Sequence, residues 1–322
     1  MKKKQIVAAA LGAAMAAALA ACGESPNARG GDDALVLAAV PAEASEELEA
    51  SFEPVVAALE HELGREVTFE AVSSNSGVIE AQVSERVDIA VYGAFSYFLA
   101  STRADVTPVA VDVLGPGMDP GVPAYGVVPA GSDITSLGDA AGADVCFTDP
   151  ASTTGYLAPA AGLIEAGVDP EADVSPTYAG GHDTALSSML AGDCDLAFAA
   201  ATFVDVLLPA RGELDPDEVE VVWESSVVPG PPFVVGNWLD EELRTQITDA
   251  LTSYDAVSAA EAGFCEGAEQ PAPEPWGDVA GEPSCMWGGT GAYAFVPTDD
   301  AAYDPIREIC EVTEAEVCTE GD

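Results

Sequence analysis

Basic residues are scarce in this 322-residue chain: Lys and Arg together number 10, against 56 Asp and Glu, and His occurs twice. The formal net charge is −46. A field of this sign repels nucleic acid and anionic lipid headgroups, so neither is expected as a partner. The carboxylates are scattered and form no Asp-x-Asp-x-Asp-Gly loop. A solvated surface suited to high salt is therefore preferred over a calcium site.

The N-terminus has the pattern of a secretory signal. Three lysines at positions 2 to 4 precede an apolar, Ala-rich run from Ile6 to Ala21. A transmembrane anchor is the alternative interpretation. The run of about 16 residues is at the short end of what crosses a bilayer, and no stop-transfer charges follow, which favours a signal peptide. It ends in Leu19-Ala20-Ala21-Cys22-Gly23, which resembles a bacterial lipobox with Cys22 as the acylated residue. We predict a signal peptide at 1–21, a flexible tether at 22–33, and an extracytoplasmic domain anchored to the cell membrane by lipid on Cys22.

Cysteine usage fits this assignment. Of seven cysteines, six remain when Cys22 carries lipid, an even set compatible with disulfides in an oxidising compartment. No Cys-x-x-Cys spacing occurs and histidine is rare, so no metal site is expected. Six cysteines allow fifteen connectivities, which leaves the pairing open. The pairings that we favour are local, Cys265 with Cys285 and Cys310 with Cys318, while Cys146 and Cys194 lie in apolar runs that could form neighbouring strands.

Apolar runs alternate with helical patterns along the chain, which favours an α/β fold with mostly parallel strands. Nearly half of the residues are apolar, enough for a sizeable core. The predicted strands are 34–40, 67–72, 87–92, 124–128, 144–147, 174–178, 196–199, 219–223 and 233–235. The predicted helices are 45–63, 77–86, 94–100, 155–166, 183–191, 241–254 and 304–312.

The predicted strands and helices alternate in two successive series, which predicts two lobes. We expect lobe 1 to comprise 34–122 and 230–322, and lobe 2 to comprise 123–229, with crossings near 123 and 230. Residues 267–292 are rich in Gly and Pro and are predicted to be a loop insertion.

A run of hydroxyls lies between a predicted strand and a predicted helix. Ser152, Thr153 and Thr154 follow Asp149-Pro150 and precede Gly155. Hydroxyl donors next to the unpaired N–H groups of a helix N-terminus form an anion site. An ordinary Ser/Thr N-cap explains the same residues, so this motif alone does not distinguish an anion site from a helix cap.

Two further segments carry candidate ligand contacts. His182 follows Gly180-Gly181 at the start of a predicted helix, where its imidazole could donate to an anion or simply cap the helix. Tyr92 ends a predicted strand, at the edge where open α/β sheets bind ligands, although a core tyrosine fits equally.

In order, these segments resemble the phosphonate- and phosphite-binding proteins of ABC transporters. The similar segments, which extend over most of the mature chain, are Val87-Asp88-Ile89-Ala90-Val91-Tyr92-Gly93, Asp149 to Gly155, Ala179 to Thr184, Val221 to Pro232 and Phe295 to Arg307. The resemblance implies a type II periplasmic-binding-protein fold, with two α/β lobes joined by a two-crossover hinge. It also implies a transport protein, not an enzyme, that needs no cofactor and delivers its ligand to an ABC permease. A monomer is expected.

The resemblance also implies the ligand and its contacts. The ligand is a small phosphorus oxyanion (phosphite, phosphate or alkylphosphonate), and its oxygens are held by six residues: Asn75 (or Ser76 beside it), Tyr92, Ser152, Thr153, Thr154 and His182. No arginine lies in these loops. Binding must then rely on neutral donors, on dipoles and, where His182 is protonated, on its charge.

One departure narrows the ligand. Aminoalkylphosphonate binders of this family hold the ammonium with acidic residues where an ungapped alignment puts Thr202 and Pro231 here. Burying an uncompensated ammonium is costly, which favours phosphite, phosphate or a small alkylphosphonate, although a one-residue gap would bring Asp205 near. Two alternatives stay open: a binder of another oxyanion such as an organic sulfonate, and a secreted hydrolase using Ser152, His182 and Asp183, which lacks a Gly-x-Ser-x-Gly elbow.

Overall fold

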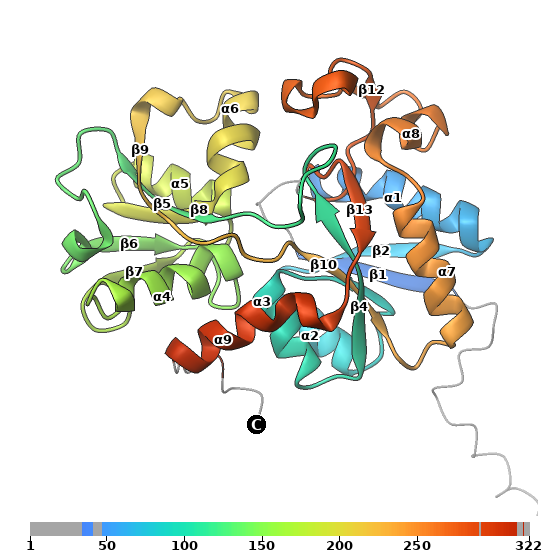
Figure 1. The fold of residues 1–322 in the computed structure, drawn as a ribbon, viewed down its shortest axis with the longest axis horizontal. Coiled ribbons are helices and arrows are strands. Elements are labelled where there is room, and N and C mark those ends of the chain that lie inside the picture. The colour runs from blue at the N-terminus through green and yellow to red at the C-terminus, as the bar shows by residue number, and fades with distance from the viewer. Residues whose placement is uncertain (1–33, 41–46, 290, 314–317, 319–322) are drawn as a thin grey trace, which may run out of the picture. The chain divides into compact units, whose positions relative to one another are not determined.

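The computed structural model describes residues 34–40, 47–289, 291–313 and 318. The predicted signal peptide and tether lie outside the described residues. Within the described part, two large sheets form, and each is covered by helices on both faces (Figure 1). No helix among the described residues is long and apolar enough to cross a membrane.

The first sheet has the strand order β13-β4-β10-β3-β1-β2. Because successive side chains of a strand point to opposite faces, Leu37 and Ala38 of β1 belong to different cores. Leu37 packs with helices α1 (Glu47–Leu63), α7 (Glu241–Thr252) and α8 (Ala256–Glu261), and Ala38 packs with α2 (Asn75–Val83), α3 (Ala94–Ser101) and α9 (Asp304–Thr313). The strands are β1 (Leu35–Ala39), β2 (Val67–Ala71), β3 (Ile89–Val91), β4 (Val106–Val113), β10 (Pro232–Gly236) and β13 (Ala294–Pro297).

The second sheet has the order β7-β6-β8-β5-β9. Phe198 of β8 packs on the face covered by α4 (Ala158–Glu165), whereas Ala197 packs on the face covered by α5 (His182–Leu190). The strands are β5 (Ala124–Pro129), β6 (Asp144–Phe147), β7 (Ser175–Tyr178), β8 (Leu196–Ala200) and β9 (Val219–Glu224).

The chain passes from the first sheet to the second after β4 and returns before β10. The two passing segments pair with each other: the N–H of Val122 donates to the carbonyl of Val228 and the reverse, both at 3.1 Å.

Most strands of each sheet run in one direction, as predicted, but the sequence did not indicate the reversed strands. In each sheet, the strand that follows a crossing runs antiparallel to its neighbours: β5 to β8 and β9, and β10 to β3 and β4. The chain crosses between the sheets at the edge formed by the carboxyl ends of the parallel strands. A strand that follows a crossing directly therefore starts at that edge. It must therefore run in the opposite direction, and both sheets are mixed.

Three disulfides join six of the seven cysteines: Cys146–Cys194, Cys265–Cys285 and Cys310–Cys318. The two local pairings favoured from sequence are confirmed. Cys146 lies in β6 and Cys194 just before the neighbouring β8, so the strand adjacency that the sequence suggested joins them.

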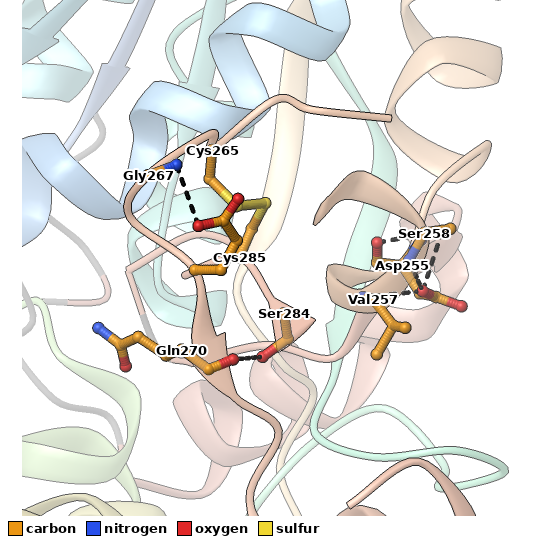
Figure 2. Close-up of a disulfide and its surroundings, with 9 residues drawn as sticks. Asp255, Val257, Ser258, Cys265, Gly267, Gln270, Ser284 and Cys285 are labelled. Carbon is orange, nitrogen blue, oxygen red and sulfur yellow. Dashed lines mark hydrogen bonds between the residues drawn. A yellow bond between two sulfur atoms is a disulfide. The ribbon is translucent and has the colours of Figure 1, made fainter. Parts of the chain in front are cut away.

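The described part of the predicted loop insertion at 267–292 contains short regular elements next to the Cys265–Cys285 bond (Figure 2). The hydroxyl of Ser284 donates to the carbonyl of Gln270 at 3.1 Å, next to the short pair β11 (Gln270–Pro271) and β12 (Pro283–Ser284). Just upstream, Asp255 caps α8 by accepting from the N–H of Val257 and Ser258. The disulfide thus ties a segment of little regular structure to the end of α8.

Gly162 tests the packing between α4 and β9. An alanine Cβ at this position would lie 2.5 Å from Cζ2 of Trp223, whose ring meets Phe198 edge-on. Helix propensity alone would make Gly162→Ala stabilising by about 1 kcal/mol. We expect the opposite, a loss of about 1 to 3 kcal/mol in the free energy of unfolding, because the ring must move in a packed core.

Urea unfolding measures this loss. Gly138→Ala is the matched control, because its Cβ would meet nothing closer than 3.7 Å. A higher urea midpoint for Gly162→Ala would contradict the packing described here.

Candidate functional site

A cavity of about 160 Å³ lies where segments from both sheets meet. Its walls come from strand ends and the loops after them: Val91 to Ala94, Thr148 and Asp149, Ser152 to Thr154, Gly180 to His182, and the crossing residues Pro229 to Pro231. The predicted site residues all line this cavity: Asn75, Tyr92, Ser152, Thr153, Thr154 and His182. The structure therefore brings together residues that are up to about a hundred positions apart in sequence.

The hydroxyl loop combines both roles that the sequence left open. Ser152 is the N-cap of a π-helical turn (Thr153–Leu157) that leads into α4, and its Oγ accepts from the N–H of Gly155 at 3.1 Å. A capping hydroxyl still has its own hydrogen to donate. Asp149 stabilises the approach to this turn, because its Oδ1 accepts from the N–H of Ala151 at 2.7 Å.

Thr153 reaches across the cavity. Its Oγ1 accepts from the N–H of Phe95 at 2.8 Å, at the start of α3, where Gly93 offers no side-chain cap. The neighbouring Ser96 is fully buried, and its hydroxyl lies 2.8 Å from both the Ala151 carbonyl and Oδ1 of Asn75. Residues in the loop after β6 of the second sheet thus cap and contact α3, a helix that packs on the first sheet.

Two further donors have no protein acceptor in the described part of the chain. Thr154 is 8% exposed and lines the cavity, and its hydroxyl makes no hydrogen bond to a described residue. The amide oxygen of Asn75 is engaged by Ser96, and no acceptor for the amide nitrogen occurs among the described residues. Both groups are available to an oxyanion.

His182 is a neutral donor in this structure. It is 8% exposed, its ring stacks on Phe203 with centroids 4.7 Å apart, and its Nδ1 accepts from the N–H of Ala200 at 3.2 Å. Burial lowers the pKa of the imidazole to about 4. With Nδ1 accepting, the single proton of the neutral ring is on Nε2. The sequence-based suggestion of a protonated His182 is therefore not supported.

The side chain of Tyr92 is directed into the core rather than at a ligand. It is 1% exposed, and its hydroxyl donates to Oε1 of Gln82 at 2.8 Å. A phenol has one hydrogen, and this one is engaged. The alternative of a core tyrosine describes the side chain better, although the residue contributes to the cavity wall.

Other cavity residues were not predicted. Thr202 and Pro231, considered above only for an ammonium, both line the cavity. Asp112 lines the cavity as well, although it lies in β4, a strand that was not predicted from the sequence. Thr148 lies beneath the hydroxyl loop, where a Cβ on Gly155 would be 1.8 Å from its Oγ1, so Gly155 permits a close approach to Thr148. No lysine or arginine occurs among the described lining residues.

Comparison with known proteins agrees with this architecture. The family model described as "ABC transporter, phosphonate, periplasmic substrate-binding protein" matches residues 37–270. A curated relative, the phosphate-import protein PhnD of Mycolicibacterium smegmatis, is 37% identical over 305 residues, covering 92% of this chain and 90% of the relative.

Two solved structures are similar in fold. The binding-protein component of an ABC phosphonate transporter from Pseudomonas aeruginosa aligns with a TM-score of 0.72 at 21% identity, over 90% of this chain and 89% of that one. PhnD1 from Prochlorococcus marinus, in complex with methylphosphonate, aligns with a TM-score of 0.66 at 17% identity, over 87% and 98%. The predicted type II periplasmic-binding-protein fold is confirmed. The chain belongs to the periplasmic substrate-binding proteins of ABC phosphonate transporters.

Proposed function

We propose that the chain binds a small phosphorus oxyanion (phosphate, phosphite or a small alkylphosphonate) between its two lobes and delivers it to an ABC permease. The observation that carries this proposal is a cavity lined by neutral hydroxyl, amide and imidazole donors. The named relatives support the ligand class, because one imports phosphate and one was solved with methylphosphonate. An organic sulfonate remains the alternative ligand.

Within this proposal, the ligand oxygens are held by the hydroxyls of Ser152, Thr153 and Thr154, by the Asn75 amide and by Nε2–H of His182. The N–H groups at the start of a helix add partial positive charge. Hydrogen bonds from neutral donors to a charged oxygen contribute roughly 1.5 to 3 kcal/mol each. A few of them compensate the desolvation of an anion without any cation.

We further propose that the protein does not turn its ligand over. Oγ of Ser152 accepts from Gly155, and Nδ1 of His182 accepts from Ala200. The neutral imidazole then has its proton on Nε2 and no free lone pair to act as a general base. Both observations argue against the hydrolase alternative.

The family is extracytoplasmic, and its members work with a membrane permease. For this chain we propose export by the signal at 1–21, acylation of Cys22, and a monomeric domain with the lobe boundaries expected from sequence. The lipobox residues and the tether, together with the strand composition of the two sheets, support this assignment.

Titration calorimetry on the mature domain tests the ligand. We expect saturable binding of at least one of phosphate, phosphite and methylphosphonate. In Thr154→Val, the affinity for that ligand should fall about 10- to 100-fold, because one donor to a charged oxygen is removed. Thr245→Val, on the exposed side of α7, is the matched control and should bind as the wild type does. Absence of binding to all three ligands would refute the proposal.

His182 gives a test that depends on pH. Because burial lowers its pKa to about 4, the ring stays neutral from pH 8 down to about pH 5.5. The ratio of the dissociation constants of His182→Ala and wild type should therefore be the same at both pH values. Ligand protonation cancels in this ratio. A ratio that grows strongly at the lower pH would indicate that a charged imidazolium binds the ligand.

The folding stability should follow the same lowered pKa. A histidine whose pKa is lower in the folded state than in the unfolded state contributes stability above the unfolded value of about 6.5. That contribution is lost as the pH falls from about 6.5 towards 4. Urea unfolding of wild type and His182→Ala across this window checks that the binding measurements use folded protein.

A further inference from the structure

Asp112 is a buried carboxylate in the wall of the anion cavity. It is 6% exposed and lies near the end of β4, which is hydrogen-bonded between β10 and β13 (Figure 1). Strand β4 runs antiparallel to β10, as β3 does, so β4 and β3 end at the same edge of the sheet. This is the edge at which the residues after β3 line the cavity.

The carboxylate is also next to the returning chain crossing. A Cβ placed on Gly230 would lie 2.5 Å from Oδ1 of Asp112, so the glycine lets the carboxylate pack against the backbone. Gly230 itself lines the cavity. Asp112 takes part in an interaction within the protein. A carboxylate has about four acceptor sites, so such an interaction leaves room for a ligand hydrogen.

The surroundings of Asp112 offer no cation from the cavity wall. Among the described lining residues, the only side chains with a carboxyl or imidazole group are Asp112, Asp149 and His182. Oδ1 of Asp149 accepts from the Ala151 backbone, and His182 is held neutral. A bound oxyanion would therefore meet a buried carboxylate, and no lysine or arginine of this wall lies between them.

Two anions are repelled at close range unless they share a proton. A phosphorus oxyanion that keeps an acidic hydroxyl can donate that hydrogen to a carboxylate. Sulfate has the same tetrahedral form but no hydrogen at neutral pH, so it would face the carboxylate with four acceptor oxygens. The binding free energies of the two ions then differ, because the phosphorus oxyanion gains a hydrogen bond to the carboxylate whereas sulfate is repelled by it.

We propose that Asp112 determines specificity by accepting a hydrogen bond from the acidic hydroxyl of the bound phosphorus oxyanion, so that the site excludes sulfate. This inference rests on the proposed function, because it assigns a role within the same cavity. The hydroxyl loop donates hydrogen bonds to any tetrahedral oxyanion, whereas Asp112 disfavours oxyanions without a hydrogen to donate. The ligand is thereby narrowed to oxyanions that carry a hydroxyl.

The test is calorimetry at pH 7 with phosphate and sulfate on wild type and Asp112→Asn. The wild type should prefer phosphate by about 100-fold or more, and Asp112→Asn should reduce this preference by about 100-fold, through weaker phosphate and stronger sulfate binding. Asp205→Asn is the charge-matched control. Asp205 is exposed, does not line the cavity and accepts from Tyr125, so the preference should stay at the wild-type value.

The outcomes separate the two claims. If the wild type binds none of phosphate, phosphite and methylphosphonate, the proposed function fails. If it binds phosphate but Asp112→Asn keeps the wild-type preference, this inference alone is overturned. If the variant keeps that preference and loses only aminoethylphosphonate, Asp112 holds an ammonium, which also overturns the inference.

A measurement on the unmodified protein covers the case in which Asp112→Asn does not fold. Methylphosphonate as its hydroxyl-bearing monoanion and methanesulfonate have the same charge and nearly the same form. The wild type should bind methylphosphonate at least about 10-fold more tightly. Equal affinities would contradict a selecting carboxylate.

Discussion

An anion must be held in this protein without a cation, because the chain carries a formal charge of −46 and the described cavity wall contains no lysine or arginine. Only hydroxyl, amide, imidazole and backbone N–H groups remain as donors. Such donors are effective where water is excluded and several of them converge. The arrangement of strand ends, helix starts and crossings brings them to one place.

The two sheets provide this convergence through their direction. Both crossings, paired at Val122 and Val228, are at the edges where the βα units of each sheet end. The hydroxyl turn at Ser152 and the start of α3 at Phe95 are therefore brought together across the cavity, and Thr153 joins them. The same geometry makes the returning strands antiparallel, so the mixed sheets and the site have one cause.

Much of this could be predicted from sequence, because it depends on local patterns. Apolar periodicity located most elements, and the motif around Ser152 identified the loop that lines the cavity. The reversed strands β5 and β10 were missed, because their direction is set by the crossings and not by any local run. Strand β4 was missed, and it contains Pro108 and Asp112, which interrupt an apolar stretch. The orientation of Tyr92 depends on Gln82, a partner that only the folded core reveals.

The salt dependence of phosphate binding tests most directly whether neutral donors hold the anion. A site built from neutral donors inside an acidic protein should bind phosphate equally well or better as salt rises from about 0.05 to 1 M, because screening weakens the repulsion from the surface carboxylates. An association constant that falls steeply over this range would mean that a cation of the protein holds the anion, and would contradict the account.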